Sequence, residues 1–390
     1  MKIGYLVHDL ADDAVHRRVR MLRSFADTAL LGFHRTAAPV PCVAGHTTVD
    51  LGRTMDARLV RRTTAVLRAA AGVHRWEECL RGCTVIVARQ LEMLALAALA
   101  RNRIAPDAAL VFECLDIHRL MLTRQPIGAA LRTLERHLLA SCSLLIVSSP
   151  AFIANHFAQY GTALPPQLLL ENKVLADDLL PDVLDHMPSV RIGRPPPGPP
   201  WRIGWFGVIR CRRSLQILTN LARRLPNLVH VVIRGRPRRN VIPDFDAMVS
   251  GTPGVSFLGE YDRHADLAAI YRDVHFAWAM DFYEADANSE WLLPNRLYEG
   301  SLHGAVPLAC ASVETGRWLA AQNCGVLLRG SSDQSIEGSL CEYFSHLDAT
   351  AYAAARTDLA RIPVSALLDD RAACGRLCSR LAALSRRSRP

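Results

Sequence analysis

The chain has 390 residues, half of them hydrophobic, so it can bury a large core and is expected to form two domains rather than one. Its formal charge of +9 comes almost entirely from arginine, because Lys2 and Lys173 are its only lysines, and this balance favours anionic partners such as nucleotides or acidic head groups. Charged and polar residues interrupt every apolar stretch before the roughly 18–20 residues that a membrane span needs, which excludes a spanning helix and predicts a soluble or peripheral protein.

Several kinds of site are excluded by motifs that the sequence lacks. Its eleven cysteines include no Cys-x-x-Cys pair, so we expect reduced thiols and neither a zinc site nor a redox site. The sequence contains no zinc finger and no aromatic-bearing sheet motif, which argues against binding to nucleic acid. The turn from His8 to Asp12 lacks the Gly-x-Gly-x-x-Gly fingerprint of a dinucleotide oxidoreductase.

The first half of the chain alternates short apolar runs with longer amphipathic stretches, the pattern of a parallel sheet covered by helices. Its first apolar run is too short for a secretory signal, so we expect it to be a strand and the protein to stay in the cytoplasm. The expected strands are 2–7, 28–33, 84–88, 109–113, 144–148 and 167–170, and the expected helices are 14–25, 58–75, 90–101 and 129–141. Residues 1–180 are therefore predicted to form one Rossmann-like domain.

A proline-rich stretch, residues 181–200, can form neither a helix nor the interior of a sheet and is expected to be an interdomain linker. A second alternation follows it, with expected strands at 201–207, 229–233, 255–258, 275–279, 306–308 and 325–328. Residues 201–365 should thus form a second Rossmann-like domain, followed by a helical tail, 366–390, that crosses back to the first. Since ligands bind at the carboxyl ends of strands in such folds, we expect the site between the two domains.

The clearest chemistry lies in the run Asn-Ser-Glu-Trp-Leu-Leu-Pro-Asn-Arg-Leu-Tyr-Glu, residues 288–299. Pro294 fits the first turn of a helix, whose N–H groups and positive dipole end suit a phosphate. Arg296 lies near that end, and Glu299, one turn on, is placed to accept two ribose hydroxyls. The alternative is a capped surface helix with an ordinary ion pair. The glycine and proline that lead into the next strand favour the functional interpretation.

These residues carry a family resemblance. Pro-Asn-Arg-Leu-Tyr-Glu followed by Gly-x-x-Pro is similar to the C-domain signature of family 4 glycosyltransferases, particularly those of bacterial exopolysaccharide synthesis. The run 207–215 resembles the Gly-x-x-x-Arg/Lys loop that grips the donor diphosphate in this family. Other matching runs, similar in type and order, are 113–118, 148–150, 171–173, 232–235 and 257–261.

The resemblance implies a GT-B architecture, in which two doubly wound Rossmann-like domains face each other across a cleft. It also implies a hexosyltransferase of polysaccharide synthesis that moves a sugar from a nucleotide-diphosphate sugar to a lipid-linked saccharide with retention of configuration. Such an enzyme would work as a peripheral protein at the inner face of an anionic membrane. No Asp-x-Asp pair flanks the diphosphate loop, so we expect no metal and no other cofactor. Two alternatives remain: a nucleotide-sugar epimerase of similar fold and a catalytically inactive nucleotide-binding partner protein.

The resemblance places donor binding in the second domain. The residues assigned to it are Gly207, Arg210, Arg213, Gly235, Tyr261, Asn288, Glu290, Asn295, Arg296 and Glu299. Breaking the anomeric C–O bond leaves negative charge on the diphosphate, which the guanidinium groups of Arg210 and Arg213 would stabilise in a catalytic role.

The chain departs from the family at one of these positions. Family 4 enzymes have two glutamates separated by seven residues, whereas eight residues separate Glu290 from Glu299. Contact of Glu290 with the transferred sugar is therefore an open question, with Asn288 and Asp286 as alternatives.

Acceptor-side residues are expected in the first domain. Asp116 and His118 follow the apolar strand 109–113, so their side chains should reach the ligand edge of the sheet. His118 would accept the proton of the acceptor hydroxyl or orient the donor sugar, and both residues are counted as catalytic. The alternative is an aspartate at a helix start with a histidine that satisfies backbone groups. Asp9 and Asp12 are expected to cap the first helix, with contact to acceptor hydroxyls as the alternative.

Overall fold

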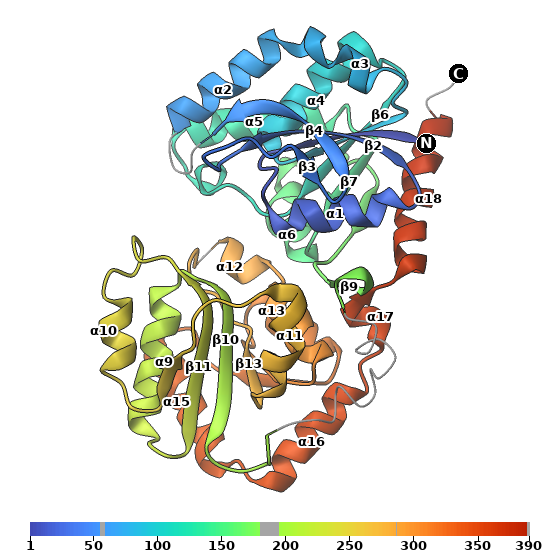
Figure 1. Cartoon of the computed structure of the whole chain (residues 1–390). Helices are drawn as coiled ribbons and strands as arrows, with labels where there is room; N and C mark the ends of the chain where they lie inside the picture. The colour runs from blue at the N-terminus through green and yellow to red at the C-terminus, as the bar shows by residue number, and fades with distance from the viewer. Residues whose placement is uncertain (55–58, 180–194, 286, 388–390) are drawn as a thin grey trace. The chain divides into compact units, whose positions relative to one another are not determined.

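The computed structural model describes residues 1–54, 59–179, 195–285 and 287–387, which divide into two compact units (Figure 1). The first unit consists of Met1–Glu171 and Asp370–Pro390, and the second of Asn172–Asp369. The segment just after Glu171 belongs to the second unit because its strand β9 (Val174–Leu175) pairs with β16 (Leu368–Asp369). Residues 181–194 of the predicted linker lie outside the described residues.

The first unit is built on an eight-stranded sheet with the order β3-β4-β2-β1-β5-β6-β7-β8. Its strands are β1 (Lys2–Val7), β2 (Asp27–His34), β3 (Cys42–Val43), β4 (His46–Arg53), β5 (Val85–Arg89), β6 (Ala109–Cys114), β7 (Leu144–Val147) and β8 (Gln167–Leu169). All pairings are parallel except the β3–β4 hairpin. Every residue of β5, β6 and β7 is buried, as expected for parallel strands covered on both faces.

Six of these strands were predicted, but β3 and β4 were not. No side chain of β4 is fully buried, and the strand therefore lacks the apolar run by which the others are recognised. The helical segments of this unit are α1 (Asp13–Arg23), α2 (Leu59–Ala71), η1 (Val73–Trp76), α3 (Glu77–Leu80), α4 (Leu91–Ile104), η2 (Arg119–Leu122), α5 (Pro126–Leu139), α6 (Pro150–Asn155), η3 (Phe157–Tyr160) and α18 (Arg371–Arg387). Figure 1 shows α1 and α4 on opposite faces of the sheet.

The C-terminal helix α18 packs against α1 and β5 of the first unit. The prediction of one helical tail from residue 366 is wrong at its start, because β16 interrupts it and α18 begins at Arg371. The pairing of Leu368 and Asp369 with β9 fixes these two residues in an extended conformation.

The second unit is built on an all-parallel sheet with the order β12-β11-β10-β13-β14-β15. Its strands are β10 (Trp201–Ile209), β11 (Val229–Pro237), β12 (Val255–Phe257), β13 (Phe276–Trp278), β14 (Val306–Cys310) and β15 (Val326–Leu328), all at predicted positions. Its helical segments are η4 (Ala176–Asp178), α9 (Arg212–Arg224), α10 (Phe245–Ser250), α11 (Arg263–Arg272), α12 (Asn288–Trp291), α13 (Asn295–Leu302), α14 (Glu314–Ala321), α15 (Asp333–His346), α16 (Ala349–Ala360) and α17 (Val364–Leu367). Trp201, Trp205 and Trp278 are fully buried in its core.

Both units are thus α/β layers around a mainly parallel sheet, which confirms the predicted Rossmann-like fold class. Among the described helices, none is both long enough and apolar enough to cross a bilayer.

Candidate functional site

Two glycines bring the backbones of β10 and β11 close together near their carboxyl ends. Gly207 and Gly235 face each other in the β10–β11 register, with φ of 111° and 125°. A Cβ atom on Gly235 would lie 1.9 Å from the carbonyl oxygen of Gly207, so only glycine fits there. A Cβ atom on Gly207 would meet nothing within 4 Å, so the backbone of β10 borders open space. Gly207 therefore lies inside β10, which extends two residues beyond the predicted strand end at 207 into the run that resembles the diphosphate loop.

The turn after β10 and the first turn of α9 carry the two arginines that were predicted to bind a diphosphate. The Arg210 guanidinium carbon lies 4.6 Å from the centre of the Tyr283 ring, and its Nη2 is 3.9 Å from Oδ2 of Asp281. That distance is too long for a hydrogen bond. The side chain is 46% exposed, and within the described residues it donates no hydrogen bond. Arg210 can thus offer its N–H groups to an anion.

Arg213, unlike Arg210, forms hydrogen bonds with other described residues of the chain. Its guanidinium carbon lies 4.3 Å from the centre of the Phe282 ring, its Nη2 donates to the carbonyl oxygen of Ser331 at 2.6 Å, and its Nε pairs with Asp333. Any contact of Arg213 with a ligand must therefore come from its remaining donors or from a rearranged pair.

Helix α13 supplies the third arginine of this edge. Pro294 is its N-cap, one position earlier than predicted, and Asn295 is exposed as its first residue. Arg296 is half-buried and donates from Nη2 to the carbonyl oxygen of Met280 at 3.0 Å. That bond ties the helix start to the segment after β13, so Arg296 and Arg210 both contact this segment.

Glu299 is buried, with 5% of its surface exposed. Its Oε1 accepts a hydrogen bond from Nη2 of Arg263 at 2.7 Å, and its Oε2 lies 3.5 Å from the hydroxyl of Tyr271. Burial is the main cause that raises the pKa of Tyr271 well above its usual value, and the Glu299 carboxylate adds to it. The alternative of an exposed surface carboxylate is therefore wrong, although Glu299 does have an arginine partner.

The segment from Asp281 to Glu284 was missed by sequence reasoning. It carries the groups that contact Arg210 and Arg213, and Oε2 of its Glu284 accepts a hydrogen bond from Nδ2 of the buried Asn288 at 2.6 Å. The available signal was an acid-aromatic-aromatic-acid run that begins two residues after the end of a predicted strand.

Two other predicted positions, Glu290 and Tyr261, flank this edge. Glu290 is half-buried in α12, and Asp286 lies outside the described residues. Tyr261, after β12, is half-buried with its ring edge-on to Phe206 at 6.4 Å. The structure thus brings Arg210, Arg213 and Arg296 to one carboxyl edge.

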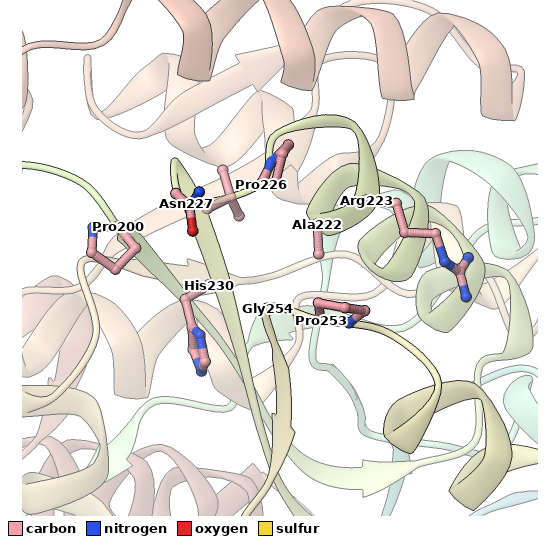
Figure 2. A pocket seen from close by; sticks show the side chains of 9 residues that line it. Pro200, Ala222, Arg223, Pro226, Asn227, His230, Pro253 and Gly254 are labelled. Carbon is pink, nitrogen blue, oxygen red and sulfur yellow. The ribbon is translucent and has the colours of Figure 1, made fainter.

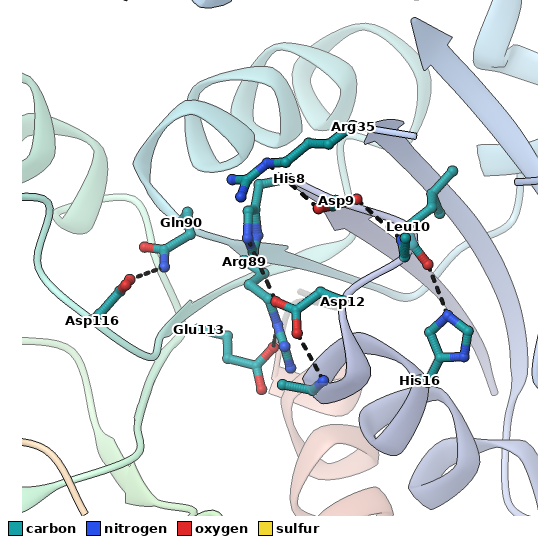
Figure 3. A network of polar contacts seen from close by, with 12 residues as sticks. His8, Asp9, Leu10, Asp12, His16, Arg35, Arg89, Gln90, Glu113 and Asp116 are labelled. Carbon is teal, nitrogen blue, oxygen red and sulfur yellow. Dashed lines mark hydrogen bonds and ion pairs between the residues drawn. The ribbon is translucent and has the colours of Figure 1, made fainter. Parts of the chain in front are cut away.

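Figure 3 shows the corresponding edge of the first unit, where polar residues follow β1, β2, β5 and β6. Asp12 is the N-cap of α1 and accepts a hydrogen bond from the backbone N–H of Ala14 at 2.9 Å, which confirms its predicted capping role. Asp9 does not cap the helix. Its Oδ1 instead accepts from the backbone N–H of Ala11 at 3.1 Å, and its Oδ2 is 3.4 Å from Nε of Arg35.

Asp116 and His118 both lie exposed after β6. Asp116 accepts a hydrogen bond from the side-chain amide of Gln90 (Figure 3). His118 is the N-cap of η2, and its Nδ1 accepts from the backbone N–H of Leu120 at 3.3 Å. Partial burial, followed by the charge of Arg62, lowers the pKa of His118, so the ring is neutral near pH 7 with its proton on Nε2. That nitrogen can donate a hydrogen bond, which favours orientation of a ligand over proton abstraction.

A buried charge cluster that the sequence did not predict lies beneath this edge. Glu113 is fully buried and accepts hydrogen bonds from the Tyr5 hydroxyl at 2.6 Å, from Nε of Arg18 at 2.7 Å and from Nε of Arg89 at 2.9 Å. Burial alone would raise the pKa of Glu113, but Arg89 and Arg18 outweigh it and hold that pKa well below its usual range. The cluster joins β1, β5, β6 and α1.

A cavity of about 390 Å³ in the second unit is lined by residues that include Pro200, Val229 and Gly254. Figure 2 shows its lining from close by. These residues lie where β10, β11 and β12 begin. Because ligands of open α/β sheets bind at the carboxyl ends of the strands, this cavity is not the predicted donor site. Within the described parts of the chain, no three His, Cys, Asp or Glu side chains gather as metal ligands.

No protein-family model matches this chain. It is 41% identical over 386 residues to the succinoglycan biosynthesis protein ExoL of Rhizobium meliloti (strain 1021), covering 99% of this chain and 94% of ExoL. Solved structures of similar fold include a sucrose-phosphate synthase from Thermosynechococcus elongatus, with a TM-score of 0.72, 13% identity and coverage of 98% of this chain and 100% of that one.

HepE from Anabaena, solved in complex with UDP, has a TM-score of 0.67 at 14% identity, with 98% of this chain and 100% of that chain covered. The lipopolysaccharide outer core galactosyltransferase WaaB has a TM-score of 0.64 at 11% identity, with both chains covered completely. The chain therefore belongs to the ExoL family of exopolysaccharide biosynthesis proteins, and its fold is that of the GT-B glycosyltransferases.

Proposed function

We propose that this glycosyltransferase moves a hexose from a nucleotide-diphosphate sugar to a lipid-linked saccharide during exopolysaccharide synthesis. The donor binds at the carboxyl edge of the second unit, and the acceptor at that of the first. The reaction needs no metal ion, retains the anomeric configuration and takes place at the cytoplasmic face of the membrane.

The observation that carries the donor assignment is the set of three arginines at one sheet edge beside a buried carboxylate. Loss of the sugar leaves the diphosphate with added negative charge, which Arg210 can meet with donors that no other described residue uses. In this proposal Glu299, one turn after Arg296 on α13, accepts ribose hydroxyls in addition to its hydrogen bond from Arg263. HepE, which shares the fold, was solved with UDP and with UDP-glucose bound, and this supports a nucleotide-sugar ligand.

On the acceptor side, we assign Asp116 and His118 to binding of the acceptor sugar whose hydroxyl reacts. His118 donates from Nε2 to a sugar hydroxyl, because its Nδ1 is used by the backbone of Leu120. Asp9 and Asp12 contribute through the turn that they fix before α1.

The deciding experiment incubates the full-length protein with a panel of UDP-, GDP- and ADP-sugars, with and without membrane lipid extract, and measures released nucleotide and labelled lipid. We expect one donor to yield nucleoside diphosphate and a labelled lipid product, unchanged by EDTA. Nuclear magnetic resonance of the new linkage reports the anomeric configuration, for which we expect retention.

Other outcomes would contradict the proposal in identifiable ways. Conversion of a nucleotide sugar into its epimer without transfer would identify an epimerase. Nucleotide binding without turnover of any donor would identify an inactive partner protein. Loss of activity in EDTA, restored by Mg²⁺ or Mn²⁺, would overturn metal independence.

A further inference from the structure

Helix α5 of the first unit has its acidic side turned inward. Glu135 is 1% exposed, and its Oε2 accepts hydrogen bonds from Nε2 of His156 at 2.6 Å and from the hydroxyl of Tyr160. Arg132 donates to the carbonyl oxygen of Thr123 at 2.9 Å. Gly128 is packed so closely that a Cβ atom would lie 2.6 Å from that same carbonyl oxygen. These contacts fix the rotation of the helix about its axis.

The apolar side of α5 consequently faces outward. Ile127 is 40% exposed and Leu134 is 41% exposed, and they lie two helical turns apart on one stripe. Leu131 and Leu138 continue the same stripe and are half-buried. Leu139 is buried, but so is Glu135, and this orientation leaves the stripe of Ile127 and Leu134 without a described partner.

Along η2, α5 and the residues that join them, the exposed charge has a single sign. Between Arg119 and Ala140 the only carboxylate is the buried Glu135, whereas Arg119, Arg124 and Arg136 are exposed. A hollow of about 290 Å³ borders the last turns of α5 and is lined by residues that include Thr133, Arg136 and Thr162. The exposed guanidinium group of Arg136 at this hollow can bind a phosphate group.

We propose that η2 and α5 form the surface by which the chain docks on an anionic phospholipid bilayer. The stripe of Ile127 and Leu134 enters the boundary of the acyl chains, and the exposed arginines bind lipid phosphates. The role of the surface rests on the proposed function, because a lipid-linked acceptor is presented at a bilayer. A second copy of the chain fits less well, since a symmetric contact through this face would bring arginines against arginines.

The test measures binding of the full-length protein to sedimented vesicles of phosphatidylcholine with about one third phosphatidylglycerol, and to phosphatidylcholine alone. We compare the wild type with the double variants Ile127→Gln/Leu134→Gln and Arg124→Gln/Arg136→Gln. The matched controls change exposed residues of the second unit, namely Leu258→Gln/Leu327→Gln and Arg272→Gln/Arg329→Gln. Melting curves confirm that each variant is folded.

We expect the wild type to bind the anionic vesicles and to bind less as salt rises, because the arginine contacts are screened. The α5 arginine variant should lose affinity by roughly 25-fold, at about fivefold for each of its two arginines, and become less salt-dependent. The α5 apolar variant should lose about tenfold or more with an unchanged salt dependence. Both controls should bind like the wild type.

Equal binding by the α5 variants and their controls would overturn the proposal. Failure of the wild type to bind anionic vesicles would overturn it as well. A wild-type dimer in analytical ultracentrifugation that the α5 apolar variant converts to a monomer would assign the face to a second copy instead. The assay uses neither donor nor acceptor. A failed sugar-transfer experiment therefore leaves its outcome unaffected, and the two failures can be told apart.

Discussion

Replacing the buried carboxylate of α13 tests the donor site most directly. Glu299→Gln keeps the volume of the side chain but removes its charge. If the carboxylate accepts ribose hydroxyls, the variant loses hydrogen bonds to a charged group, which are worth roughly 1.5–3 kcal/mol, so the affinity for nucleoside diphosphate should fall about ten- to a hundredfold. The structure adds a second effect, because Glu299 also holds Arg263 at 2.7 Å. Loss of that partner should lower the free energy of unfolding by roughly 1–3 kcal/mol.

Arg263→Gln separates the two effects, since it breaks the same ion pair but keeps the carboxylate. We expect both variants to melt at a lower temperature than the wild type, and Glu299→Gln alone to lose donor affinity by tenfold or more. Isothermal titration calorimetry with UDP, GDP and ADP measures the affinity, and denaturant unfolding measures the stability. A Kd for Glu299→Gln equal to that of the wild type, or an equal loss of affinity in both variants, would refute the assignment of Glu299 to the ribose.

Three further predictions concern the first unit and the glycine pair. His118→Ala should lower turnover with little change in nucleoside-diphosphate affinity. His118→Asn, which keeps an N–H donor, should recover part of the rate. Equal losses of kcat and affinity would contradict the assignment of His118 to the acceptor side. Glu113→Gln leaves the buried guanidinium of Arg89 without its charge partner and should cost roughly 3–5 kcal/mol in denaturant unfolding. Because the folded pKa of Glu113 is depressed, its stabilisation is fully present above the unfolded pKa of about 4.3 and is lost as the pH falls toward the folded value, so Glu113→Gln should flatten the acid limb of the stability profile. Gly235→Ala forces a Cβ atom to within 1.9 Å of a carbonyl oxygen and should destabilise the second unit by more than about 2 kcal/mol. Gly207→Ala is strained only by its φ of 111° and should cost about 1 kcal/mol. Similar melting temperatures of the two variants would contradict this prediction.

The alternation of apolar runs and amphipathic stretches was sufficient to predict twelve of the fourteen strands of the two large sheets, most of which are buried. It was sufficient because a strand of a covered parallel sheet is apolar on both faces and stands out from its neighbours in the sequence. The same logic located the residues at the carboxyl edges, since parallel strands all end on one side of their sheet. Asp116 was placed in this way, two residues after its strand, whereas Arg210, one residue after its strand, was assigned through the family resemblance.

Elements without an apolar run were not predictable. Strand β4 is half-exposed throughout, and β16 is an extended pair of residues in a helical context that exists because β9, nearly two hundred residues earlier, pairs with it. No local period encodes such a partner.

The sequence by itself therefore determined the α/β class of both units and the edge at which each should bind its ligand. Only the tertiary structure decided which charges meet: Glu113 collects partners that lie 24, 95 and 108 residues away along the chain. It also decided that Glu299 is buried against Arg263 and that α5 buries Glu135 while exposing Ile127 and Leu134. The physical reason is that burying a charge is tolerated only beside a partner, and a partner is chosen by the packing of whole strands and helices rather than by neighbours in the sequence.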